Sequence, residues 1–94
     1  MKERPNQPSS FPITRFVASF DDLLDRIASG IEHSVEYKGR YYLLSDCAYW
    51  GNWVVLCEQD EEEPQSYRDE EEFAERATLH GDLLRDIWQE LVLV

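Results

Sequence analysis

The sequence predicts a small α+β domain, a three-stranded antiparallel sheet packed by helices in the order αβββαα, with residues 92–94 as a candidate short C-terminal edge strand. Hydrophobic side chains have helical spacing in residues 19–30, alternate with polar ones in residues 31–38 and return to helical spacing after residue 69. The chain has 94 residues, 43% of them hydrophobic, which is enough for one core and too few for two.

The N-terminal part predicts an arm followed by a capped helix. Residues 1–12 combine three prolines with polar side chains, so we expect a flexible arm over residues 1–15 and a single domain over residues 16–94. Ser19 and Asp22 have the spacing of a capping box, and Gly30 suits a left-handed helix end. The apolar positions between them are Phe20, Leu23, Leu24, Ile27 and Ala28.

Alternating side chains next predict a β-hairpin with Lys38 and Gly39 as its two-residue turn. This turn fixes the register, because the residues that it places opposite one another share a face. The expected pairs are Tyr37 with Arg40, Val35 with Tyr42 and His33 with Leu44. Residues 53–57 are expected to form a third strand, antiparallel to the second.

The C-terminal third predicts two helices. Asp69 and Glu72 form a second capping box before a helix that contains Phe73, and His80 with Gly81 interrupts it. Leu83, Leu84, Ile87, Trp88 and Leu91 mark the last helix. The predicted core consists of Phe20, Leu24, Ile27, Val35, Tyr42, Val55, Phe73, Leu84, Ile87 and Trp88.

The charge is strongly acidic and unevenly placed. The formal net charge is -11, and because residues 1–19 balance to +2, the rest of the chain carries -13. Such a charge disfavours direct binding to nucleic acid or anionic membranes and favours a basic protein partner, or it serves only solubility. We expect a cytoplasmic protein, because there is no apolar run of membrane-spanning length, no signal-peptide core and only two cysteines.

Catalytic and metal sites are not expected. Cys47, Cys57, His33 and His80 lack the close-paired spacing of zinc ligands, and a Cys47–Cys57 disulfide would join residues that a hairpin holds apart. The sequence contains no nucleophile elbow, phosphate-binding glycine loop or spaced metal-binding carboxylates. We therefore predict a protein that is not an enzyme and has no cofactor and no metal.

Residues 58–75 hold ten of the twenty acidic residues and a single basic one. A helix start explains Asp69 and its neighbours, but it does not explain Asp60–Glu63. Two interpretations remain open, solvation alone or a surface for a basic partner. In the second, a row of carboxylates stands in for phosphates, which recur about every 3.4 Å along a DNA strand. That surface would comprise Asp60, Glu61, Glu62, Glu63, Glu70, Glu71 and Glu75, with Tyr49, Trp50 and Tyr67 as aromatic anchors or as ordinary packing at the rim.

A resemblance rests on FDDLLDRIASG, VEYKGRYYLL, GNW, SYRDEEEF and HGDLLRDIWQEL. Through these stretches, residues 20–94 resemble small uncharacterised acidic α+β proteins of bacteria and their phages or mobile elements. The arm and the DEEEP run are not part of that pattern. Proteins of this kind are often inhibitors, such as anti-CRISPR proteins, or immunity proteins for toxins, so the resemblance implies a role of that kind.

Three functions follow as expectations. The first is a small non-enzymatic inhibitor of the anti-CRISPR type, which binds a basic nucleic-acid-binding effector through the carboxylate-rich surface. The second is an immunity protein that covers the basic active site of a nuclease toxin. The third is a structural or housekeeping protein whose acidity only confers solubility. The sequence leaves the partner and the oligomeric state open.

Overall fold

The structure is a computed structural model that describes residues 10–47, 52–59 and 62–94. In chain order its elements are β1 (Phe11–Pro12), the 3-10 helix η1 (Ile13–Arg15), α1 (Phe20–Ala28), β2 (His33–Tyr37), β3 (Arg40–Cys47), β4 (Asn52–Cys57), β5 (Gln65–Tyr67), α2 (Glu70–Arg76), β6 (Thr78–Leu79), β7 (Asp82–Leu83), α3 (Leu84–Ile87), the 3-10 helix η2 (Trp88–Glu90) and β8 (Val92–Leu93).

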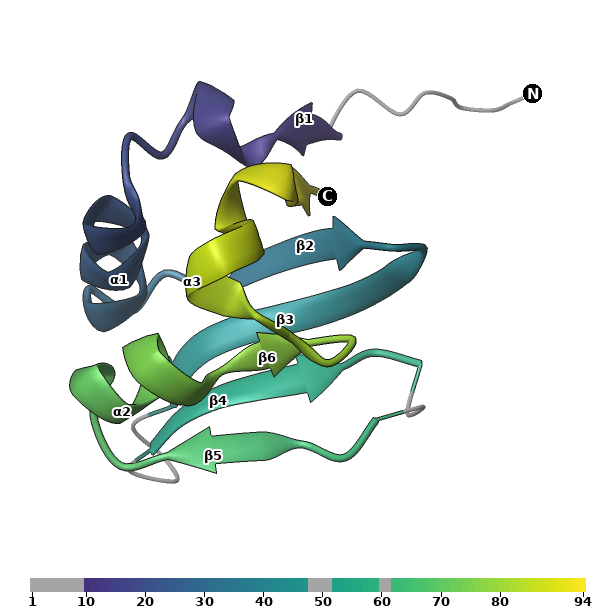
Figure 1. The fold of residues 1–94 in the computed structure, drawn as a ribbon. Coiled ribbons are helices and arrows are strands. Elements are labelled where there is room, and N and C mark those ends of the chain that lie inside the picture. The colour runs from purple at the N-terminus through teal and green to yellow at the C-terminus, as the bar shows by residue number, and fades with distance from the viewer. Residues whose placement is uncertain (1–9, 48–51, 60–61) are drawn as a thin grey trace.

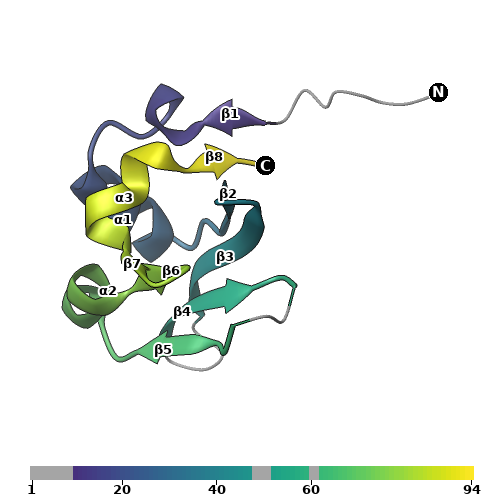
Figure 2. The same cartoon turned by 45° about the vertical axis from the view of Figure 1, so that its right-hand side comes forward.

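The larger sheet has six antiparallel strands in the order β1-β8-β2-β3-β4-β5. The small β6-β7 hairpin forms a second sheet. The three α-helices lie on one side of the larger sheet, as the two views in Figures 1 and 2 show. The fold is therefore α+β with a helical layer on one sheet face.

Helix α1 forms as its capping residues predict. Ser19 is extended, and its hydroxyl oxygen accepts a hydrogen bond from the Asp22 N–H at 3.0 Å. Asp22 Oδ2 accepts in turn from the Ala18 N–H at 2.9 Å, so two free N–H groups at the helix start are satisfied. Gly30 follows the helix with φ 94°, the left-handed conformation that glycine adopts without a steric penalty.

The β2–β3 hairpin confirms the predicted turn and register. Tyr37 pairs with Arg40, Val35 with Tyr42 and His33 with Leu44. Lys38 and Gly39 have φ values of 51° and 79°, as expected for a two-residue turn that matches the twist of its strands. The third predicted strand is also present, since β4 pairs antiparallel with β3.

The predicted core is confirmed. Eight of its ten residues are buried in one cluster, and Phe20 and Ile87 pack against that cluster with partial exposure. Phe73 of α2 is fully buried, and the centre of its ring lies 5.0 Å from that of Trp53 and 5.9 Å from that of Tyr67. These contacts hold α2 on β4 and β5. They therefore fix the position of the carboxylates at the start of α2, which belong to the acidic segment of residues 58–75.

The predicted three-stranded sheet and the order αβββαα are wrong. The larger sheet has six strands because β5 adds to β4 on one side, and β8 and β1 add to β2 on the other. β5, β8 and β1 are only two or three residues long, so they carry no alternating pattern. The predicted edge strand at residues 92–94 is present as β8 (Val92–Leu93), but β8 lies between β1 and β2 and is therefore an interior strand.

The last predicted helix is shorter than expected. His80 and Gly81 have φ values of 54° and 83° and form the turn of the β6–β7 hairpin. The following apolar positions then divide into one turn of α3 and the 3-10 helix η2, because Ile87 departs from helical geometry with φ -117° and ψ 2°.

The first described residues belong to the fold. Phe11 and Pro12 pair with Leu93 and Val92, and Ile13 is fully buried. The Ile13 N–H also donates to the Leu91 carbonyl oxygen at 2.9 Å. The predicted arm of residues 1–15 therefore extends too far, because its last residues are tied to β8 and the core. Residues 1–9 lie outside the described residues.

Candidate functional site

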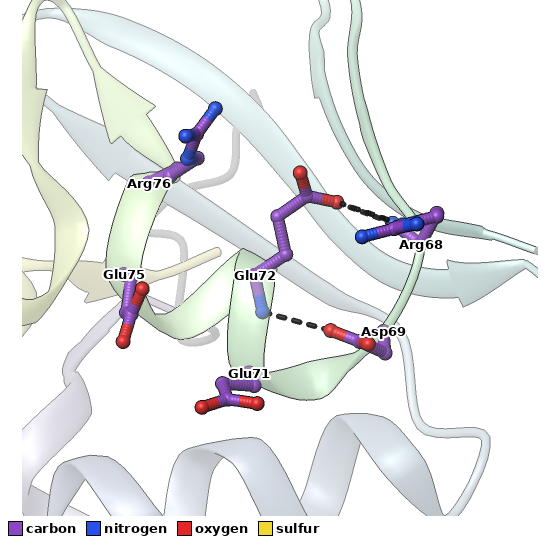
Figure 3. Close-up of a pocket in the computed structure, with 6 residues that line it drawn as sticks. All are labelled: Arg68, Asp69, Glu71, Glu72, Glu75 and Arg76. Atoms are coloured by element: carbon purple, nitrogen blue, oxygen red, sulfur yellow. Dashed lines mark hydrogen bonds and ion pairs between the residues drawn. The ribbon is translucent and has the colours of Figure 1, made fainter.

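Helix α2 begins with two carboxylates that serve the helix itself. Asp69 is extended, and its Oδ1 accepts a hydrogen bond from the Glu72 N–H at 2.9 Å. The Glu72 carboxylate accepts from the Arg68 N–H at 2.8 Å (Figure 3). The predicted cap is confirmed, and these two charges satisfy backbone N–H groups at the helix start.

The other carboxylates of α2 form an exposed surface. Glu70, Glu71 and Glu75 are exposed, and none of their carboxylates forms a hydrogen bond or ion pair with another described residue. We call these three residues the acidic face of α2. Helix α1 packs beside α2 and adds the exposed Asp21 and Asp25. The two neighbouring helices therefore present several carboxylates to solvent.

A shallow groove lies along α2, and Figure 3 shows its lining. The lining residues are Arg68, Asp69, Glu71, Glu72, Glu75 and Arg76. The lining contains four carboxylates and two guanidinium groups, so the charges along the groove have a negative balance. The ion pair of Arg68 with Glu72 is long, at 4.0 Å, and the Arg68 side chain is 86% exposed, so it offsets little of that charge.

Glu62 has a different role from the acidic face. It accepts a hydrogen bond from the Tyr42 hydroxyl, and its Oε2 lies 3.7 Å from both Arg40 Nε and His80 Nδ1. Its side chain is 25% exposed. One carboxylate thus links β3, the segment before β5 and the β6–β7 turn, so Glu62 acts as a structural link beneath the surface.

Tyr42 is the buried partner in this link. Its side chain is fully buried, and burial, followed by the hydrogen bond to Glu62, raises the pKa of its phenol well above the ordinary value of 10.0. The phenol therefore stays protonated and donates its hydrogen bond at any physiological pH. This arrangement holds structure together and leaves no reactive phenolate.

The remaining predicted partner-binding residues divide into three groups. Glu63 is exposed, in line with a surface role. Tyr67 is half-buried, and its hydroxyl donates to Gln65 Oε1 at 2.6 Å, so its contacts fit packing at the rim of the core. Tyr49, Trp50, Asp60 and Glu61 lie outside the described residues.

A second charged cluster has no clear signal in the sequence. Asp82 Oδ2 accepts from the Tyr37 hydroxyl at 2.7 Å and from Lys38 Nζ at 3.0 Å. The Tyr37 hydrogen bond, followed by that of Lys38, lowers the pKa of Asp82, and the bond to Asp82 raises the pKa of Tyr37. This contact ties the β2–β3 turn to the β6–β7 hairpin, between residues more than forty positions apart.

His33, His80 and Cys57 belong to three different elements, β2, the β6–β7 turn and β4, and the side chain of Cys47 lies outside the described part of the structure. His33 is buried with Nδ1 3.2 Å from the Ile31 carbonyl oxygen, and burial lowers the pKa of its imidazole. His80 is exposed at a turn, and Cys57 is a buried thiol that pairs across the strands with Tyr42. Within residues 10–47, 52–59 and 62–94, no three potential metal ligands are grouped closely enough to hold an ion.

Comparison with protein-family models, with curated proteins and with solved structures finds no match to this chain. The resemblance to small uncharacterised acidic α+β proteins, and the inhibitor role that it implies, therefore stay predictions. Among the described residues, no helix has the length and apolar character needed to cross a membrane.

Proposed function

We propose that this protein is a small acidic inhibitor of the anti-CRISPR type, which binds a basic nucleic-acid-binding protein in the cytoplasm through a carboxylate-rich surface. The residues that would act are Glu70, Glu71 and Glu75 of the acidic face, together with Glu63. They would occupy a cationic channel that otherwise receives the phosphates of a nucleic acid. The protein would act by binding alone, without catalysis.

One observation carries this proposal, the pair of Glu71 and Glu75. These like charges stand at positions i and i+4 of α2, where mutual repulsion costs about 0.2–0.5 kcal/mol. Glu75 also lies in the last turn, where the helix dipole disfavours a carboxylate. Helix capping therefore explains Asp69 and Glu72 but not Glu75, and a basic partner would supply the missing stabilisation.

The test is capture of the partner from cells of the source organism, with the wild type and two variants of equal charge. Glu70→Gln/Glu71→Gln/Glu75→Gln removes the acidic face. The control, Glu32→Gln/Asp86→Asn/Glu90→Gln, removes three exposed carboxylates elsewhere. At low salt we expect association with the first variant to be at least about tenfold slower, and with the control to change little.

Competition by a DNA duplex identifies the kind of partner. If the acidic face stands in for phosphates, duplex DNA displaces the captured protein, and association slows steeply as salt rises. Equal loss of association in the two variants would contradict the proposal, as would a partner that DNA does not displace. Capture of a nuclease toxin, with inhibition of its activity, would instead establish the immunity-protein alternative.

A further inference from the structure

The second face of the six-stranded sheet is not covered by any described helix. All three α-helices lie on the opposite side (Figure 2). Strand alternation sends every second side chain to this open face. From β2, β3, β4, β5 and β8 these are Ser34, Glu36, Tyr41, Leu43, Ser45, Val54, Leu56, Ser66 and Val92. Ser45 and Val54 are themselves buried, so the accessible part of this face relevant to docking lies around Tyr41, Leu43 and Leu56.

Strand register places these side chains in rows across the sheet. One row contains Val92, Glu36 and Tyr41, and the Glu58 N–H extends it by donating to the Tyr41 carbonyl oxygen at 2.8 Å. Tyr41 therefore stands between two carboxylates. The Ser34 hydroxyl donates to Glu58 Oε2 at 3.4 Å, which shows that Glu58 lies over this face.

The next row is more apolar. Ser34 pairs with Leu43, and Leu43 pairs with Leu56. Both leucines are half-buried, and Tyr41 is 38% exposed. The exposed Val94 lies at the end of this row, because its N–H donates to the Ser34 carbonyl oxygen at 3.0 Å. The open face thus combines an apolar strip with an exposed aromatic ring and two acidic groups.

The charges on this face have no counterpart within the described structure. Neither Glu36 nor Glu58 forms an ion pair with a described residue, and none of the outward positions named above is Lys or Arg. An arginine fits the row well, since its guanidinium can stack on a tyrosine ring while it donates to carboxylates on either side.

We infer that this open sheet face is a docking surface for a protein segment that presents an arginine flanked by apolar side chains. The arginine would stack on Tyr41 between Glu36 and Glu58, and the apolar side chains would cover Leu43 and Leu56. The inference rests on the proposed basic partner and names a second contact surface for it. A second copy of this chain fits poorly, because it would bring further carboxylates against Glu36 and Glu58.

The probe is the short peptide acetyl-Val-Leu-Arg-Leu-Val-amide, added to the isotope-labelled full chain and followed by NMR. We expect the largest amide shifts in β2, β3 and β4 around Tyr41 and Leu43. The matched peptide with citrulline in place of arginine has nearly the same shape without the charge. The citrulline peptide should bind the wild type at least about threefold more weakly than the arginine peptide does. The arginine peptide should bind Glu36→Gln/Glu58→Gln more weakly than the wild type by a similar factor.

The acidic face of α2 provides the control. Glu70→Gln/Glu71→Gln/Glu75→Gln should leave the shifts in β2–β4 unchanged, so failure of the α2 proposal and failure of this one are separable. If Glu36→Gln/Glu58→Gln does not fold, the binding of the arginine and citrulline peptides to the wild type still tests the inference. Equal binding of the citrulline peptide, shifts confined to α2, or concentration-dependent dimerisation through β2–β4 would each overturn the inference.

Discussion

Replacing Glu62 by glutamine tests whether part of the acidic segment stabilises the fold. The glutamine keeps the shape and can still accept from Tyr42, but it removes the charge that faces Arg40 and His80. If every carboxylate in this segment only repelled its neighbours, neutralisation would leave stability equal or higher. The structure predicts the opposite for Glu62.

The magnitude follows from three contacts. A hydrogen bond to a charged acceptor contributes about 1.5–3 kcal/mol and a neutral one about 0.5–1.5, so loss of the charge costs roughly 1 kcal/mol at Tyr42. The pairs with Arg40 and His80 are 3.7 Å long and partly exposed, and each adds a few tenths at most. The expected decrease in the free energy of unfolding is about 1–2 kcal/mol.

The assay is urea unfolding followed by tryptophan fluorescence. The matched control is Glu63→Gln, which removes the same charge at the next position from an exposed side chain and should stay within about 0.5 kcal/mol of the wild type. A double-mutant cycle with Tyr42→Phe should give a coupling energy of roughly 1 kcal/mol. If Glu62→Gln costs no more than Glu63→Gln, Glu62 is not a structural link.

Three further predictions concern the fold. Burial lowers the pKa of the His33 imidazole below 6.5, so between that lowered value and pH 6.5 the unfolded chain binds more protons than the folded chain. The free energy of unfolding should therefore decrease on acidification through this window. His33→Gln should make the decrease in the urea midpoint between about pH 7.5 and 5.5 smaller. A slope that His33→Gln leaves unchanged would assign the effect to other groups. Trp88 is 8% exposed, so Trp88→Ala should cost about 3–5 kcal/mol in chemical unfolding, and a near-neutral result would contradict its place in the core. Asp69→Ala should cost about 0.5–2 kcal/mol and lower helical circular dichroism, whereas Glu70→Gln, one residue later, should change neither; similar effects of the two would show that the cap is not formed.

The elements that could be predicted are those whose signals are local. The β2–β3 hairpin follows from alternation and from the Lys38–Gly39 turn, and α1 and α2 follow from Ser19 and Asp69 with their partners three residues later. The information for each of these lies within a few residues. Their sequence signals therefore agree with the structure.

The elements that could not be predicted depend on distant partners. Gln65 fixes β5 with its side chain, which donates from Nε2 to the Thr78 carbonyl oxygen at 2.8 Å and accepts from the Thr78 N–H at 3.1 Å. A strand of three residues is too short for an alternating pattern that would predict it from the sequence. The structural role of Glu62 could not be predicted for the same reason. In a run of carboxylates, nothing in the sequence distinguishes the one that contacts Tyr42, Arg40 and His80.

The position of β8 constrains the order in which the chain can fold. Phe11 pairs with Leu93, 82 residues further along, and Leu93 pairs on its other side with Val35. β1 therefore has no strand to join until β8 has taken its place beside β2. During synthesis β1 must wait until residues 92 and 93 have left the ribosome, and the β2–β3–β4 meander can assemble well before then. A stalled or shortened chain that ends before residue 92 would expose the edge of β2 and leave Phe11 and Ile13 without their partners, a state prone to pairing with other chains.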